Sequence, residues 1–348
     1  MSEPIKTALL SFGMSGSVFH APFITHDDRF QLYAVWEREK NLANQKYPFI
    51  QTFRSLEDLL KDPQIELVVV NTPNSTHAEY SHKCLEAGKH VIVEKPFTIT
   101  SAESRELIQL AAQKHRVLSV YHNRRFDSDF KTVVKVIEGG RLGKITEAEF
   151  HFDRYKEGLS AKTHKEIPAP GTGALYDLGA HLIDQALSLF GMPQAVFADI
   201  RIIRPLSQVD DYFELLFYYP DKRVRLHCSY LVKESLQAFI LHGAKGSFVK
   251  YRADPQETQL QENKVPGSAN WGREPEKYRG ILHIEQNGTS VREEVETSAG
   301  NYGEYYQKIF EAVRNNAPAP VSGQEAEQVI RIIETAFQSS KERRVVDL

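Results

Sequence analysis

The feature that most constrains the fold is an alternation, from residue 5 to about residue 122, of short apolar runs with helical patterns. Residues 67–70, for example, read LVVV, and a strand without polar side chains is expected to be covered on both faces. Parallel sheets built from strand–helix–strand units show this alternation. The pattern predicts strands at residues 6–11, 31–36, 65–72, 90–93 and 117–121.

Two of the intervening helices carry signals for their ends. Ser55 and Asp58 fit a capping box at the start of a helix over residues 55–60, and Gly88 follows a helix over residues 76–87. Residues 1–122 are therefore predicted to form an α/β domain with a doubly wound parallel sheet.

The pattern changes beyond residue 122. Apolar and polar residues alternate at 146–152, as in an antiparallel strand with one covered face. Further strands are expected at 195–204, 212–219, 223–231 and 238–251, and helices at about 175–190, 302–315 and 323–341. Residues 123–348 are predicted to form an α+β domain with a large, mostly antiparallel, open-faced sheet.

Charge and composition argue against several classes of protein. The net charge of −3 and the lack of a basic cluster beside aromatic residues argue against nucleic-acid binding. No apolar stretch approaches a membrane-spanning length, and the first residues lack the pattern of a signal peptide. Cys84 and Cys228 are far apart and fit neither a disulfide framework nor metal-ligand spacing. The prediction is a cytoplasmic protein.

The segment that follows the first predicted strand, residues 11–16, reads SFGMSG. It fits the G-x-G-x-x-G dinucleotide fingerprint with serine in place of the first glycine. Gly13 would let the backbone approach a pyrophosphate, and Gly16 would permit close helix packing. A glycine turn in an unrelated strand–helix unit is the alternative interpretation. The residues expected to contact the cofactor here are Phe12, Gly13, Met14, Gly16 and Ser17.

The choice between NAD and NADP depends on two residues after the second strand. Glu37 lies 21 residues after Gly16, where a carboxylate can accept hydrogen bonds from the adenine ribose. Arg38 could instead pair with the 2′-phosphate of NADP. The sequence favours NAD slightly and leaves NADP open.

Two further segments follow strands whose carboxyl ends are expected to meet at the same edge of the sheet. The turn over residues 72–77 is placed to contact the nicotinamide half of the cofactor, although it could equally be a proline turn that starts the next helix. Residues 94–96 read EKP and place a lysine at this edge, where an ordinary solvated lysine is the alternative. The residues concerned are Thr72, Pro73, Asn74, His77, Glu94 and Lys95.

The predicted helix at 175–190 carries Asp177, His181 and Asp184 at positions i, i+4 and i+7, which share one helix face. Oxidation of a hydroxyl needs a base that titrates near neutrality, and a carboxylate beside an imidazole supports the charge that the ring acquires. His181 is therefore the candidate base, with Asp177 orienting it. A metal site and a polar helix start remain as alternatives; we expect no metal.

Taken together, the segments at 11–22, 94–96 and 177–181 resemble the Gfo/Idh/MocA oxidoreductase family. Residues 121–127, 176–185 and 242–251 are similar to the branch that contains NADP-dependent scyllo-inositol dehydrogenase. The resemblance spans essentially the whole chain.

The resemblance implies an N-terminal Rossmann domain that binds NAD or NADP and a catalytic set of Lys95, Asp177 and His181. It also implies that Asn123, Arg124, Tyr155 and Tyr302 line a polyol site. The implied reaction moves a hydride between the cofactor and a secondary alcohol or ketone of a polyol or sugar, with an inositol-like substrate favoured. Lys95 would bind the reacting oxygen, and His181 would take its proton.

Two other functions fit the same sequence. The first is a cofactor-binding sensor without catalysis, against which the intact Lys95, Asp177 and His181 argue. The second is a glycosidase that uses transient hydride transfer and returns its cofactor unchanged. An open-faced sheet would also favour a homodimer or homotetramer formed through the C-terminal domain.

Overall fold

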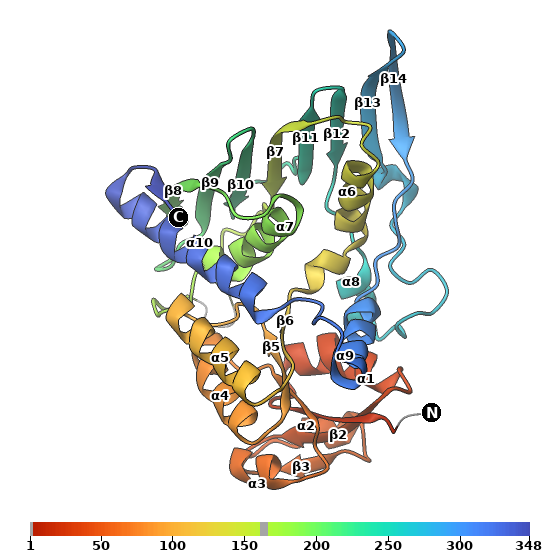
Figure 1. The fold of residues 1–348 in the computed structure, drawn as a ribbon, viewed down its shortest axis with the longest axis vertical. Helices are drawn as coiled ribbons and strands as arrows, with labels where there is room; N and C mark the ends of the chain where they lie inside the picture. Colours follow the sequence, from red (N-terminus) through yellow and green to blue (C-terminus); the bar gives the residue numbers. More distant parts are fainter. Residues whose placement is uncertain (1–2, 161–165) are drawn as a thin grey trace. The chain divides into compact units, whose positions relative to one another are not determined.

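The computed structural model describes residues 3–160 and 166–348, which divide into two compact units (Figure 1). Unit 1 contains the chain up to Asn123 together with Pro255–Trp271 and Asn301–Glu327. Unit 2 contains Arg124–Asp254, Gly272–Gly300 and Gln328–Leu348. Each unit is built around its own sheet.

Unit 1 contains the predicted doubly wound parallel sheet, with strand order β3-β2-β1-β4-β5-β6. Every neighbouring pair in it is parallel. The strands are β1 (Ile5–Leu9), β2 (Phe30–Trp36), β3 (Gln51–Phe53), β4 (Leu67–Val70), β5 (His90–Glu94) and β6 (Leu118–Tyr121). The sequence did not predict the short strand β3, which lies at the sheet edge.

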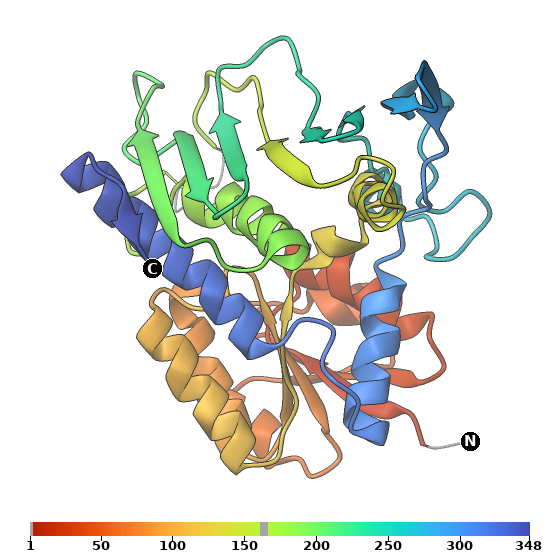
Figure 2. The same cartoon turned by 45° about the horizontal axis from the view of Figure 1, so that its top comes forward.

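Helices cover both faces of this sheet. In Figures 1 and 2, α4 and α5 lie side by side on one face, and α1 and α9 lie on the other. Ser55 caps α3 by accepting a hydrogen bond from the Asp58 N–H at 3.1 Å, which is one half of the predicted capping box, and Gly88 follows α4 with a φ of 73°. The helices of unit 1 are α1 (Ala21–Thr25), α2 (Leu42–Lys46), α3 (Leu56–Lys61), α4 (His77–Glu86), α5 (Ser101–Gln113), α8 (Gln256–Gln261) and α9 (Gly303–Asn315).

Unit 1 is not one continuous stretch of the chain, because two later segments also belong to it. Helix α9 supplies Tyr305, whose hydroxyl donates to the Ser119 hydroxyl at 2.8 Å, and Tyr306, whose ring stacks on that of Phe23. Both tyrosines are fully buried. These contacts fill the face of the parallel sheet that α1 and α9 cover, so the first unit is completed by residues far along the chain.

Unit 2 contains a nine-stranded sheet of order β14-β13-β12-β11-β7-β10-β9-β8-β15. The pair β7–β10 is parallel and the remaining pairs are antiparallel, which confirms the predicted mostly antiparallel sheet. The strands are β7 (Ile145–His151), β8 (Ala195–Arg201), β9 (Tyr212–Tyr218), β10 (Arg223–Ser229), β11 (Phe239–Gly243), β12 (Gly246–Lys250), β13 (Gly280–Gln286), β14 (Thr289–Val295) and β15 (Val346–Asp347).

One face of this sheet is packed against helix α7 (Ala180–Phe190), and neither Figure 1 nor Figure 2 shows a helix on the other face. Phe150 of β7 contacts Phe190 of α7, with ring centroids 6.4 Å apart. Burial alternates along β9, where Phe213 and Leu215 are buried and their neighbours are half-buried. The sheet is therefore open-faced, as the alternation predicted.

Several local predictions for the second half are corrected by the structure. The strand expected at 238–251 is a hairpin of β11 and β12, because the backbone turns at residues 244–245. Helix α6 (Ser128–Glu138) and the hairpin of β13 and β14 were not predicted. The expected helices near 302–315 and 323–341 are present as α9 and α10 (Gly323–Glu342).

Candidate active site

The glycine segment after β1 leads into a π-helical turn at Ser15–His20, which continues into α1. A Cβ atom added to Gly16 would lie 2.3 Å from the Ser11 carbonyl oxygen, so this position accepts only glycine without a backbone shift. Gly13 is exposed, and an added Cβ would meet no protein atom within 4 Å. The two glycines thus have different roles: Gly16 permits packing and Gly13 leaves open space.

Ser11, which replaces the first glycine of the fingerprint, is fixed by Asn71 at the end of β4. The Ser11 N–H donates to Asn71 Oδ1 at 3.0 Å, and Asn71 Nδ2 donates back to the Ser11 carbonyl at 2.9 Å. The Ser11 hydroxyl donates to the Asn71 carbonyl at 2.9 Å. Asn71 was not predicted to have a role, although a polar side chain directly after a buried strand indicates the edge where ligands bind.

The other residues of the fingerprint lie differently. The Phe12 ring is buried and meets Tyr47 edge to face, with centroids 6.0 Å apart. Met14 is 42% exposed, and Ser17 is half-buried. Phe12 therefore contributes its side chain to the core of unit 1, while Met14 lies at the surface.

Glu37 is buried, and the backbone of α2 engages both of its carboxylate oxygens. Its Oε1 accepts from the Leu42 N–H at 3.2 Å, and its Oε2 accepts from the Ala43 N–H at 3.1 Å. Arg38 beside it is exposed. The carboxylate expected to bind the ribose is thus oriented by the start of a helix.

His77 joins two of the predicted cofactor segments from inside unit 1. Its Nδ1 lies 2.8 Å from the Pro96 carbonyl, and its Nε2 lies 3.0 Å from the Thr72 carbonyl. The side chain is buried, and burial lowers the pKa of the imidazole. The exposed Pro73 and the half-buried Asn74 follow in the turn itself. His77 therefore holds the backbones of the two segments together.

Three residues at this edge of the sheet contact the side chain of Glu94, which ends β5. It accepts hydrogen bonds from the Ser15 hydroxyl and, at 3.1 Å, from the Lys95 N–H. Its Oε1 lies 3.0 Å from His20 Nε2. Burial alone would raise the pKa of Glu94, but His20, Ser15 and the charge of Lys95 outweigh it and hold this pKa at about 2.

Two further features lie next to Glu94. The peptide bond between Lys95 and Pro96 is cis. His20 Nδ1 lies 2.6 Å from the hydroxyl of Tyr306 in α9. His20 and Tyr306 were not predicted to have a role; they lie 286 positions apart, so only the fold brings them together.

In unit 2, the helix that carries Asp177 and His181 begins with a π-helical turn at Leu175–Gly179 and continues as α7. Turns of this kind occur frequently at functional sites. The His181 side chain is 5% exposed, and its ring lies near that of Phe152, with centroids 6.4 Å apart. Asp184, one turn further on, forms a bidentate ion pair with Arg125 at 2.6 and 2.8 Å. Asp184 is therefore occupied in anchoring α7.

Asp210 fixes the N-terminal end of the same helix. Its Oδ2 accepts from the Leu175 N–H at 2.8 Å, and its carbonyl accepts from the Ala174 N–H at 2.8 Å. Gly173 has a φ of 100°, and a Cβ added there would lie 1.8 Å from Asp210 Oδ1. Burial raises the pKa of Asp210 to about 6, with a contribution from the charge of Asp211. In the sequence, only the glycine- and proline-rich stretch before the helix indicated that the helix begins here.

Two comparisons identify the kind of protein. Residues 5–122 match the model of the oxidoreductase family's NAD-binding Rossmann fold, and residues 134–348 match the model of its C-terminal alpha/beta domain. The chain is 38% identical to the scyllo-inositol 2-dehydrogenase (NADP(+)) IolW of Bacillus subtilis, over 99% of this chain and 96% of that protein. The chain belongs to the Gfo/Idh/MocA oxidoreductase family.

Solved structures of other oxidoreductases agree. The oxidoreductase YvaA of Bacillus subtilis has a TM-score of 0.95 and 38% identity, and the match covers 99% of this chain and 98% of that one. An oxidoreductase from Bacteroides fragilis has a TM-score of 0.91 and 46% identity, with 99% and 100% covered. Unit 1 of this Gfo/Idh/MocA protein therefore binds NAD or NADP.

The four residues that the family resemblance assigned to the substrate lie in contrasting surroundings. Asn123 is buried, and Arg124 donates to Asp127 at 3.2 Å. Tyr155 is 47% exposed and donates its hydroxyl to Glu157. Tyr302 has no exposed surface, and its N–H donates to Gln256 Oε1 at 2.7 Å.

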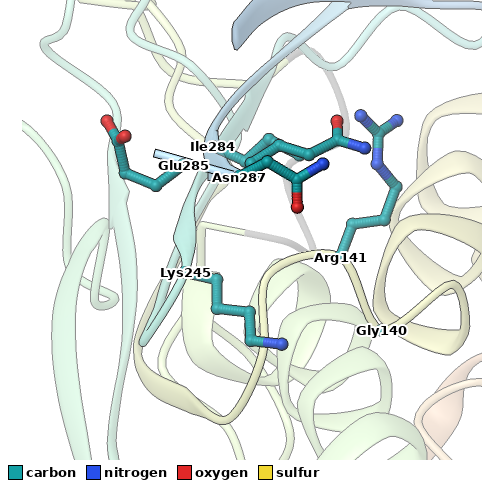
Figure 3. Close-up of a pocket in the computed structure, with 7 residues that line it drawn as sticks. Gly140, Arg141, Lys245, Ile284, Glu285 and Asn287 are labelled. Atoms are coloured by element: carbon teal, nitrogen blue, oxygen red, sulfur yellow. The ribbon is translucent and has the colours of Figure 1, made fainter. Parts of the chain in front are cut away.

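A surface hollow of about 420 Å³ lies elsewhere in unit 2 of this Gfo/Idh/MocA protein (Figure 3). Its lining combines the residues after α6 with the β11–β12 and β13–β14 turns, and it contains none of the predicted site residues. The residues are Gly140, Arg141, Lys245, Ile284, Glu285, Gln286 and Asn287.

In the described parts of the chain, no helix is long and apolar enough to cross a membrane.

The two glycines provide a matched pair of variants. Gly16→Ala should destabilise the protein by about 1 to 3 kcal/mol, because its Cβ would collide with the Ser11 carbonyl. Gly13→Ala should keep wild-type stability but raise the KM for the cofactor roughly 10-fold or more, because its Cβ enters the space left for the ligand. Urea unfolding and steady-state kinetics of both variants check this; equal behaviour of the two would contradict it.

Asp210 should make the protein less stable as the pH rises. Its folded-state pKa of about 6 lies above the unfolded value near 3.9, so between these values the folded state binds more protons and stability falls with increasing pH. The free energy of unfolding should lose about 1 to 2 kcal/mol from this group between pH 5 and pH 7.5. Asp210→Asn should remove that loss in urea unfolding measured at both pH values.

Asp221→Asn is the control for this experiment. Asp221 lies on the surface, and the neighbouring Lys222 lowers the pKa of its carboxyl. Its substitution should therefore change the pH dependence slightly and in the opposite direction. The same slope in wild type and Asp210→Asn would exclude Asp210 as its source.

Proposed function

We propose that this protein is an NADP-dependent dehydrogenase that interconverts a secondary alcohol and a ketone on a polyol or sugar, with an inositol-like substrate. The observation that carries the proposal is the link from Ser15 through Glu94 to Lys95. It joins the cofactor turn after β1 to the lysine after β5 at one edge of the sheet. In doubly wound sheets the ligand binds at the carboxyl ends of the strands.

Lys95 is the group that binds the reacting oxygen. As the alcohol is oxidised, its C–H bond breaks and the carbon gives its hydride to the nicotinamide, which is the chemistry that the bound cofactor supplies. Negative charge develops on the oxygen as its proton leaves for His181, and the Lys95 ammonium group stabilises that charge until the carbonyl has formed. The hydrogen bond from the Lys95 N–H to the Glu94 carboxylate fixes the backbone at this position.

His181 accepts the hydroxyl proton, and Asp177 orients its ring. This assignment rests on the family motif over residues 177–181. The near-complete burial of His181 supports it, because a buried imidazole is held in a fixed orientation and exchanges protons through its immediate partners. Ketone reduction uses the same groups in reverse, with His181 donating the proton.

An inositol-like substrate is favoured by the similarity to IolW, whose substrate is scyllo-inositol. A polyol presents several hydroxyls, each of which needs a donor or an acceptor. Asn123 and Arg124, with Tyr155 and Tyr302, are the residues we assign to this recognition. They offer amide, guanidinium and phenol groups suited to hydroxyls.

NADP is favoured over NAD by the environment of Glu37 and Arg38, which reverses the slight preference drawn from the sequence. The N–H groups of α2 engage both Glu37 oxygens, so part of the hydrogen-bonding capacity of this carboxylate is already used. The exposed Arg38 next to it is available for a 2′-phosphate. IolW is itself NADP-dependent.

The open face of the unit 2 sheet is the proposed surface for a homodimer or homotetramer. Half-buried apolar side chains alternate with charged ones there, among them Phe197, Leu216 and Ile240. Apolar surface of this kind is often covered in an assembly.

The proposed location is the cytoplasm. Cys84 and Cys228 are free thiols, which suits its reducing environment.

Lys95→Ala should lower kcat with an inositol by about two to three orders of magnitude, the usual cost of removing one group that stabilises developing charge. Cofactor binding, measured by fluorescence titration of NADPH, should change little. Lys83→Ala is the control, because Lys83 is an exposed lysine that pairs with Glu79 on α4. Near-wild-type turnover by Lys95→Ala would overturn the assignment of this residue.

Arg38→Ala should raise the KM for NADP about 10- to 100-fold and leave the KM for NAD nearly unchanged, because a charge-assisted hydrogen bond contributes about 1.5 to 3 kcal/mol. Lys40→Ala removes a nearby exposed cation and should affect neither value. Initial rates with both cofactors test the prediction. An equal loss for NAD and NADP in Arg38→Ala would show that Arg38 does not read the phosphate.

A further inference from the structure

Three side chains that the proposed reaction does not use converge on the open face of the unit 2 sheet. His151 ends β7, and His227 lies opposite it on the parallel neighbour β10. Asp153 follows His151 by two residues, so in an extended chain its side chain lies on the same face. The three side chains are mostly buried, with relative exposures of 10%, 20% and 5% for His151, His227 and Asp153.

The Asp153 carboxylate lies between the two imidazole rings. Its Oδ1 is 2.9 Å from His227 Nδ1, and its Oδ2 is 3.3 Å from His151 Nδ1. One ligand atom from each of the three residues lies within 4.8 Å of the other two. In a tetrahedral zinc site with bonds of about 2.1 Å, ligand atoms are about 3.4 Å apart, so small side-chain adjustments would place all three around one ion.

The surrounding contacts are those that orient metal ligands. His151 Nε2 lies 3.3 Å from Glu149 Oε2, and Asp153 Oδ1 accepts the Ser229 N–H at 2.9 Å. Glu149 is held in turn by Arg225 at 3.0 Å. A histidine whose second ring nitrogen faces a carboxylate is the usual arrangement behind a metal-bound imidazole, because that carboxylate fixes the ring and raises its basicity.

The charge of the cluster also suits a cation. Asp153 contributes a carboxylate, and a histidine binds a metal through its neutral imidazole. Two imidazoles and a carboxylate form a donor set that prefers zinc and related divalent transition metals to calcium or magnesium.

We propose that His151, Asp153 and His227 bind one divalent transition-metal ion of the zinc class through two ring nitrogens and a carboxylate oxygen. The fourth position is left to water or to a further ligand. The ion would join β7 to β10, the one parallel pair described in the nine-stranded sheet of unit 2. Its role is to stabilise this strand pair, and it takes no part in the proposed hydride transfer.

The test uses the full chain without an added histidine tag, first freed of metal with a chelator. Zinc binding by isothermal titration calorimetry should show one site per chain, and Co²⁺ should give the visible absorption bands of a low-symmetry site. His227→Ala and Asp153→Asn should each lower zinc affinity at least 100-fold. Glu149→Gln, which changes only the group behind His151, should lower it about 10- to 100-fold.

His242→Ala and His283→Ala are the matched controls, because both histidines belong to the same sheet, on β11 and β13. Each variant should bind zinc as the wild type does. Zinc should also raise the melting temperature of the wild type and of both controls, but not of His227→Ala, because a ligand stabilises only the folded state that binds it. Circular dichroism confirms that each variant is folded.

Two results would overturn the proposal: a folded wild type that takes up no stoichiometric zinc or cobalt, or binding that survives both His227→Ala and Asp153→Asn. The first would leave the cluster as an ion-pair network between imidazoles and a carboxylate. The test does not measure dehydrogenase activity. A failure of the proposed metal site can therefore be distinguished from a failure of the proposed function.

Discussion

The predicted functional edge of unit 1 depends on the Glu94 carboxylate, whose side chain is only 14% exposed. It ties the turn after β1 through Ser15, the helix that follows through His20, and the backbone of Lys95 into one cluster. A buried charge that loses its partners costs several kcal/mol, so these residues depend on one another. Tyr306, whose hydroxyl lies 2.6 Å from His20 Nδ1, extends the cluster to α9, a helix late in the chain.

Much of the fold follows from local pattern, and the failures occur where distant residues decide. The LVVV run at 67–70 and the glycine segment at 11–16 specify a covered strand and the turn that follows a strand, whatever the rest of the chain does. The return of α9 to unit 1 depends instead on contacts such as Tyr305 with Ser119, 186 positions apart. Helical periodicity predicts that α9 has a buried face but not which sheet buries it.

The candidate site shows the same division. Lys95 and His181 could be proposed from the sequence because the residue types and spacing of their motifs are local. The residues that fix the neighbouring segments were not predicted: Asn71, which binds Ser11, is 60 positions from it, and Asp210, which binds Leu175, is 35 positions from it. The sequence around Asn71 and Asp210 does not indicate which distant residue each of them binds. Sequence can thus indicate the chemistry of such a site, whereas the supports that fix its geometry become visible only in the fold.

The alternation of a single strand connects the two faces of the unit 2 sheet. Along residues 151–153, His151 and Asp153 lie in the cluster on the open face, while the Phe152 ring between them packs near the ring of His181. Side chains of an extended chain alternate in direction, so one short segment serves both faces. Any ligand that fixes His151 and Asp153 therefore also fixes the backbone of Phe152. Phe152 thus lies between the cluster on the open face and the candidate base His181.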